Sequence, residues 1–277
     1  MQVMIDTNEL RRGERATGQT TVVSFLKNKG GVGCTTNAFN FAAFMAQRDY
    51  KVLLLDGDMQ GDCTALCRVP HQPGMYNLLV NGGIWDDVWV GVPGDLYGNP
   101  RGMLYIVPSD EGSGKSIAGG MTGQGIVSSR LAEIEGRFDL VVVDTSPSAS
   151  ELHAELYLAS QYVVYPVQCQ AEPINAIKRS LSNYQNYANW AKQNGHAVAE
   201  ILGIMPVMFR GRDKLQHQLK GWLEGRYGEY VMPEIRDLTA WQQAAAKRLP
   251  IFIYEPSSPA AKEAVAVYEG FEAVLYG

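Results

Sequence analysis

The stretch that most restricts the possible folds of this chain runs from Thr21 to Thr36, TVVSFLKNKGGVGCTT. It begins with a mostly apolar, β-branched run, continues through a glycine-rich loop at residues 27–33, and takes helical spacing from Cys34 onward. A strand, a glycine turn and a helix start form a phosphate cradle, because backbone N–H groups converge on an anion at the positive end of the helix dipole. An ordinary glycine-rich turn is the alternative, but the strand before the loop and the helix after it favour a P-loop.

Of two positions at the end of this loop, one fits the P-loop motif and the other departs from it. Thr35 occupies the place whose hydroxyl binds Mg²⁺ in P-loops. The preceding place holds Cys34 instead of the lysine that contacts the β- and γ-phosphates. The motif thus predicts a nucleotide-binding site more securely than a catalyst.

The loop KNKGGVGCTT resembles the deviant Walker A motif, KGGVGKTT, of the ParA and MinD group of P-loop ATPases. Proteins of that group carry two lysines. The first matches Lys29 and in the family reaches across an ATP-bound homodimer to the partner's nucleotide, and the second is absent at Cys34. The resemblance implies binding of ATP with Mg²⁺ by the loop residues and by two C-terminal positions. The implied nucleotide-binding residues are Lys29, Gly30, Gly31, Val32, Gly33, Cys34, Thr35, Thr36, Met208 and Pro233.

Acidic residues follow two further apolar strands, KVLLLDGDMQ at residues 51–60 and FDLVVVDTSPS at residues 138–148. Because ligands bind beyond the carboxyl ends of parallel strands, Asp56, Asp58 and Asp144 should share one edge of the sheet. Capping of the following turns is the structural alternative for the first two carboxylates. In the family, Asp58 matches the residue that positions the attacking water, so Lys29 and Asp58 are the expected catalytic residues. Thr35, Asp56 and Asp144 are expected to hold Mg²⁺, partly through water.

Two other motifs are weaker. GSGKS, with Lys115, follows a predicted strand at residues 104–108, but Ser109 stands where a second P-loop requires glycine. A remaining hypothesis is that Lys115 compensates in space for Cys34. Cys63, Cys67 and His71 are spaced by four, but Pro70 would break a helix there, so buried thiols are favoured over a metal site.

The length and the 46% apolar content suit one large α/β domain. We predict a doubly wound, mostly parallel sheet of about seven or eight strands flanked by helices, spanning 21–277 after an extension at 1–20. The region at residues 232–262 resembles the ParA C-terminal stretch, in which a proline loop meets adenine and a helix precedes a final short strand. The last helix, Pro259–Leu275, is too acidic for a membrane helix and should pack on the sheet.

Charge limits the possible partners. The net charge is −5 and the pI about 5.5, so any DNA contact requires a local basic patch. In ParA proteins, basic residues of the C-terminal region bind DNA without sequence preference, and solvated helix faces are the alternative here. No disulfide framework, signal peptide or 18-residue apolar run is evident, so we expect a cytoplasmic protein, which would be nucleoid-associated if it binds DNA. The candidate DNA-binding residues are Lys220, Arg236, Lys247 and Arg248.

The resemblance implies a ParA-like positioning ATPase that segregates plasmid, chromosome or protein cargo with a ParB-like activator. Loss of the loop lysine should cost about 3–4 kcal/mol of transition-state stabilisation, so hydrolysis should be slow or absent. Because Cys34 lies at a predicted helix N-terminus, we also expect its thiol pKa to be lowered, and the resulting thiolate would repel phosphate. The alternative is a non-hydrolysing pseudo-ATPase scaffold. A nitrogenase-type iron protein would need cluster cysteines at other positions.

Overall fold

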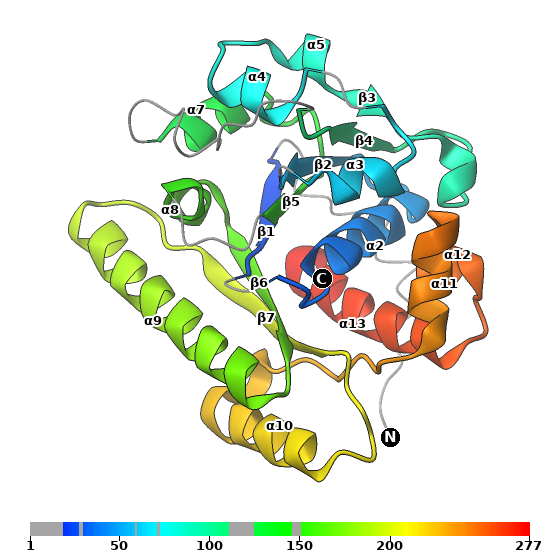
Figure 1. The fold of residues 1–277 in the computed structure, drawn as a ribbon. Coiled ribbons are helices and arrows are strands. Elements are labelled where there is room, and N and C mark those ends of the chain that lie inside the picture. The colour runs from blue at the N-terminus through cyan, green and yellow to red at the C-terminus, as the bar shows by residue number, and fades with distance from the viewer. Residues whose placement is uncertain (1–18, 28–29, 59, 71–72, 111–124, 146–150) are drawn as a thin grey trace.

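The computed structural model describes residues 19–27, 30–58, 60–70, 73–110, 125–145 and 151–277. Within them a seven-stranded sheet lies between two layers of helices (Figure 1). The strand order is β3-β4-β2-β5-β1-β6-β7, with parallel pairing throughout except where β3 pairs antiparallel with β4. The strands are β1 (Thr21–Phe25), β2 (Val52–Gly57), β3 (Val90–Gly91), β4 (Leu104–Val107), β5 (Leu140–Thr145), β6 (Tyr162–Gln168) and β7 (Glu200–Val207).

Helices connect the strands and cover both faces of the sheet. Short 3₁₀ turns lie at Gly94–Leu96 and Gly228–Tyr230. The α-helices are α2 (Cys34–Gln47), α3 (Asp62–Leu66), α4 (Met75–Leu79), α5 (Trp85–Val88), α7 (Ile126–Ala132), α8 (Glu151–Ala159), α9 (Ala171–Gln193), α10 (Lys214–Tyr227), α11 (Thr239–Lys247), α12 (Ile251–Tyr254) and α13 (Pro259–Tyr276). None of these described helices is long and apolar enough to cross a bilayer.

Alternation along the central strands builds two cores. In β1, Val23 and Phe25 point to the face covered by α2 and α13, whereas Val22 points to the face covered by α4, α5, α7 and α8. Successive strand residues face opposite sides, so continuously apolar strands require helices on both faces. The predicted doubly wound, mostly parallel sheet is confirmed, with seven strands.

The central strands are in register where their carboxyl ends carry acids. Phe25 pairs with Asp144 across β1 and β5, and Asp56 pairs with Asp144 across β2 and β5. The loop between β1 and α2 starts at the same edge, since Cys34 is the first residue of α2. Parallel pairing thus brings the loop and the acids together, as the strand patterns predicted.

The C-terminal region departs from the predicted pattern in one element. The apolar segment at Ile251–Tyr254 forms the helical turn α12, not the final short strand that the family resemblance implied. Pro250 precedes it, and the Ile251 N–H donates to Asn40 Oδ1 at 2.7 Å, which ties the turn to α2. Phe252 packs edge-on against Phe44, so the segment fills the helical layer and adds nothing to the sheet. The last helix packs on α2 and the sheet as predicted, through Tyr268 and Phe271.

Candidate functional site

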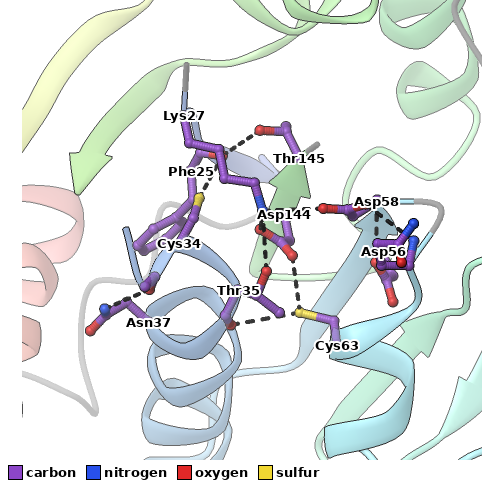
Figure 2. A network of polar contacts seen from close by, with 12 residues as sticks. Phe25, Lys27, Cys34, Thr35, Asn37, Asp56, Asp58, Cys63, Asp144 and Thr145 are labelled. Atoms are coloured by element: carbon purple, nitrogen blue, oxygen red, sulfur yellow. Dashed lines mark hydrogen bonds and ion pairs between the residues drawn. The ribbon is translucent and has the colours of Figure 1, made fainter. Parts of the chain in front are cut away.

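Two of the acids predicted at the strand ends, Asp58 and Asp144, lie beside a lysine that precedes the glycine loop (Figure 2). Lys27 lies two residues beyond β1 and is only 8% exposed. Its Nζ is 3.2 Å from Asp58 Oδ2, 4.0 Å from Asp144 Oδ1 and 3.3 Å from Thr35 Oγ1. Four segments of the chain therefore meet at one ammonium group.

The charges in this cluster are coupled. Burial by itself lowers the pKa of Lys27, but Asp144 and the other nearby groups outweigh it and hold the pKa above its ordinary value. Burial raises the pKa of Asp144, and the Lys27 ammonium offsets part of that rise. The ammonium therefore stays charged and acts as the counter-ion of the strand-end carboxylates.

Thr35 and Asp144 have the donor chemistry of a magnesium site. Oδ1 of Asp144 is buried and accepts no hydrogen bond from any described residue, and the Thr35 hydroxyl lies beside the same ammonium. Mg²⁺ at nucleotide sites takes one or two protein oxygens together with phosphate oxygens and water. A buried carboxylate oxygen that accepts no hydrogen bond and lies next to a P-loop threonine fits that requirement.

Asp56, the third predicted metal ligand, is occupied by other contacts. Its Oδ2 accepts hydrogen bonds from the backbone N–H and the hydroxyl of Thr64, at 2.8 and 2.6 Å, and its Oδ1 accepts from the Asp58 N–H. Burial, together with the charge of Asp144, raises the pKa of Asp56 to about 7. In this arrangement Asp56 orients α3, and a role at Mg²⁺ stays a prediction.

Cys34 lies in the first turn of α2 and is turned toward the protein interior. Its side chain is buried, with Sγ 3.3 Å from the carbonyl oxygen of Phe25. Burial and the charge of Asp144 raise its pKa well above the ordinary value. The predicted lowering of this pKa is therefore wrong, because desolvation of a thiolate outweighs the helix N-terminus. Cys34 is a neutral thiol that contributes no cation.

The cysteines that were weighed as a metal site are buried thiols instead. Cys63 and Cys67 are buried thiols, and Cys63 Sγ lies 3.6 Å from Asp144 Oδ2. Among the residues that the structure describes, no group of three His, Cys, Asp or Glu side chains could hold a metal. The positions that fall outside the described residues are Lys29, His71 and Lys115.

A cavity of about 230 Å³ opens beside the loop. Its walls come from the start of α2, the end of β7 and the segment that leads into α11. The predicted nucleotide contact Met208 lines it, whereas Pro233 is exposed and lies outside its walls. The lining residues are Gly33, Thr36, Asn37, Val207, Met208, Ile235, Arg236, Asp237, Leu238, Trp241, Gln242 and Ala245.

Gln168, the last residue of β6, joins this cavity to the loop. Its Nε2 donates to the carbonyl oxygen of Gly31 at 2.9 Å and lies 2.8 Å from Met208 Sδ. Asn37 ties the loop to α13, since its Nδ2 donates to Gly33 O and its Oδ1 accepts from the Tyr268 hydroxyl. The loop is therefore held from both sides by side-chain hydrogen bonds.

The structure does not gather the four candidate DNA-binding residues into one cluster. Lys220 on α10 is paired with Glu224 and Glu234, and Arg236 is paired with Glu263. Lys247 and Arg248, at the end of α11, are exposed and form no ion pair with the described part of the chain. Helices α10 and α11 lie at different sides of the molecule (Figure 1).

Sequence reasoning missed three residues of this region. Lys27 lies outside the family's loop motif, although a lysine directly after an apolar strand and before a glycine loop is a usable signal. Gln168 and Trp241 had no comparable signal, since only the packing of β6 and α11 brings them to the loop.

Known proteins resemble this chain in sequence. A family model described as an AAA domain matches residues 20–194. The chromosome-partitioning ATPase Soj of Thermus thermophilus is 29% identical over 212 residues, covering 76% of this chain and 78% of Soj.

Solved structures share the fold. A McdA–ATP complex from Cyanothece superposes with a TM-score of 0.76 at 19% identity, covering 93% of this chain and 97% of that one. The septum site-determining protein MinD of Pyrococcus horikoshii with Mg-ADP gives 0.72 at 15% identity, covering 92% and 97%. The family match over most of the chain, the shared fold and the strand-end acids beside a P-loop place this chain in the ParA/MinD superfamily of P-loop ATPases.

Proposed function

We propose that this protein is a partition-type ATPase that binds ATP with Mg²⁺ at the loop between β1 and α2. The observation that carries the proposal is the convergence of Thr35, Asp58 and Asp144 at one sheet edge, next to a cavity of about 230 Å³. The cavity has apolar walls at Ile235 and Leu238 and is suited to a planar base. MinD of P. horikoshii holds Mg-ADP on the same fold, and a McdA complex holds ATP.

Each residue of the cluster has a role in this proposal. Thr35 and Asp144 would hold Mg²⁺, which when bound neutralises charge on the phosphate oxygens. Asp58 would orient a water molecule, and its carboxylate is already held by the Gln60 N–H on Oδ1 and by Lys27 on Oδ2. Lys29 would reach the nucleotide of a second copy in an ATP-bound dimer.

The relatives support a proposal for the cellular role. Soj of T. thermophilus is a chromosome-partitioning ATPase. We assign this chain to the same class, with non-specific DNA binding in the cytoplasm, cargo of plasmid, chromosome or protein, and a ParB-like activator. Hydrolysis is proposed to be slower than with a loop lysine, because Cys34 is a buried neutral thiol.

The buried thiol of Cys34 also favours a second candidate, a nucleotide-bound scaffold without turnover. ATP turnover with Mg²⁺, measured with and without plasmid DNA for the wild type, Asp58→Ala and Cys34→Lys, separates the two. Turnover that Asp58→Ala abolishes supports the ATPase. Activity that appears only in Cys34→Lys supports the scaffold, and failure of the wild type to bind ATP contradicts both.

DNA binding has a test of its own. Arg68 donates to the carbonyl oxygen of Lys247, so it lies beside Lys247 and Arg248 at the end of α11. The variant Lys247→Glu/Arg248→Glu should weaken plasmid binding and lower the salt dependence by roughly one unit of slope for each lost phosphate contact. Lys220→Ala is the matched control, because that lysine already pairs with Glu224 and Glu234. Equal losses in both would contradict this assignment.

A further inference from the structure

We propose that Lys27 supplies the positive charge that the loop lacks at Cys34, and that its ammonium binds the terminal phosphate oxygens of a nucleoside triphosphate. This inference rests on the proposed nucleotide site. It assigns the phosphate-binding cation to a residue before the glycine loop instead of one within it.

The position of Lys27 supports this role. Its side chain comes from the end of β1, seven positions before Cys34 in the sequence, yet its Nζ lies 3.3 Å from the hydroxyl of Thr35, the residue after Cys34. Phosphate bound by that loop would lie near the Thr35 hydroxyl, since this threonine binds the phosphate-bound metal in P-loops. The Lys27 ammonium is therefore within a small movement of phosphate oxygens.

Cys34 does not compete for this place. Its Sγ is directed to the carbonyl oxygen of Phe25, 3.3 Å away, and its side chain is buried beneath the loop. Figure 2 shows the thiol directed to Phe25 and the Lys27 ammonium facing Asp58, Asp144 and Thr35. The Cys34 side chain carries no positive charge, and the Lys27 ammonium places one beside Thr35, the next residue.

A structural counter-ion is the alternative for Lys27. Two buried carboxylates, Asp58 and Asp144, lie beside this single ammonium, so some pairing is needed in the nucleotide-free protein. Lys27 would leave Thr35 and Asp144 when a divalent cation occupies them, because like charges repel at contact distance. The adjacent phosphate then offers the negative charge that the ammonium requires.

The test compares ATP and ADP binding in four proteins: the wild type, Lys27→Met, Cys34→Lys and the variant with both changes. Isothermal titration calorimetry with Mg²⁺ gives each dissociation constant, and thermal unfolding checks each fold. Lys27→Met should reduce the preference for ATP over ADP by roughly 10- to 100-fold, as expected for a charged hydrogen bond. Adding Cys34→Lys should restore most of it.

Three outcomes are decisive. Recovery in the double variant supports the inference, because a purely structural counter-ion would not be rescued by a loop lysine. An unchanged ATP preference in Lys27→Met overturns it while leaving the proposed function standing. A wild type that binds no ATP overturns the proposed function itself.

A measurement on the unaltered protein covers the case in which Lys27→Met does not fold. The ¹⁵N signal of the Lys27 ammonium, assigned with Lys27→Arg, should shift more with a non-hydrolysable ATP analogue than with ADP. Equal shifts with the two nucleotides would overturn the inference.

Discussion

The two ends of the candidate site use different physical means. The phosphate end, made by Lys27, Thr35, Asp58 and Asp144, concentrates buried charge contributed by four segments of the chain. The base end, which is the cavity beside Trp241, has mainly apolar walls. Charge distinguishes ligands by the number of phosphates, whereas an apolar cavity responds to the size and stacking of the base. Changes at the phosphate end should therefore alter the ATP to ADP ratio, and changes at the base end should weaken both ligands alike.

The largest effect is expected from Asp144→Asn. It should weaken Mg²⁺-dependent ATP binding by roughly 10- to 100-fold, as for loss of a group that orients a bound metal. The nucleotide-free protein should become more stable, with a melting temperature higher by roughly 2–4 °C for each kcal/mol, because one of three crowded buried carboxylates is neutralised. Exposed Asp87→Asn is the control. A lower melting temperature would show that the carboxylate stabilises the fold.

At the base end, Trp241→Ala should weaken ATP and ADP binding equally. Loss of an aromatic surface against a base costs at least about 1 kcal/mol, or roughly fivefold or more in affinity. Trp241→Phe should lose less, and Trp222→Ala on α10, outside the cavity, should leave both affinities unchanged. Fluorescent nucleotide titration measures these constants. A loss confined to ATP would remove the distinction between the two ends.

Gln168 contacts the loop at the phosphate end and Met208 at the base end, so its replacement should weaken the binding of ATP and ADP alike, by a smaller factor. Gln168→Leu removes the hydrogen bond to Gly31 O and the contact with Met208 Sδ. One neutral hydrogen bond is worth about 1 kcal/mol, which corresponds to roughly fivefold in affinity. Gln170→Leu, at an exposed neighbouring position, is the matched control. An effect above tenfold would mean that the loop depends on this contact for its shape.

The smallest change is expected for thiol chemistry at Cys34. Because burial raises its pKa, iodoacetamide at pH 8 should label Cys34 at least about tenfold more slowly in the folded protein than in urea. Mass spectrometry of the labelled peptide measures the rate. If the folded protein were labelled rapidly and ATP blocked the labelling, Cys34 would be an accessible thiolate at the phosphate end.

Much of the phosphate end could be predicted from local signals. The order of strand, glycine loop and helix located the P-loop, and the apolar strands that end in Asp56, Asp58 and Asp144 located the sheet edge. These predictions succeeded because a buried parallel strand has a continuous apolar pattern and its carboxyl end has a defined place in the sheet. At the base end only Gly33, Thr36 and Met208 were predicted, since its other walls come from segments far apart in the chain.

The sequence by itself determined the family, the fold class and the edge of the sheet where the chemistry lies. Only the tertiary structure decided that Cys34 faces inward as a neutral thiol, that Lys27 stands beside Thr35, and that Ile251–Tyr254 forms a helical turn. It also paired Lys220 and Arg236 with acids. Strand and loop types follow from local spacing, whereas side-chain direction, burial and charge pairing depend on neighbours that packing brings from elsewhere in the chain.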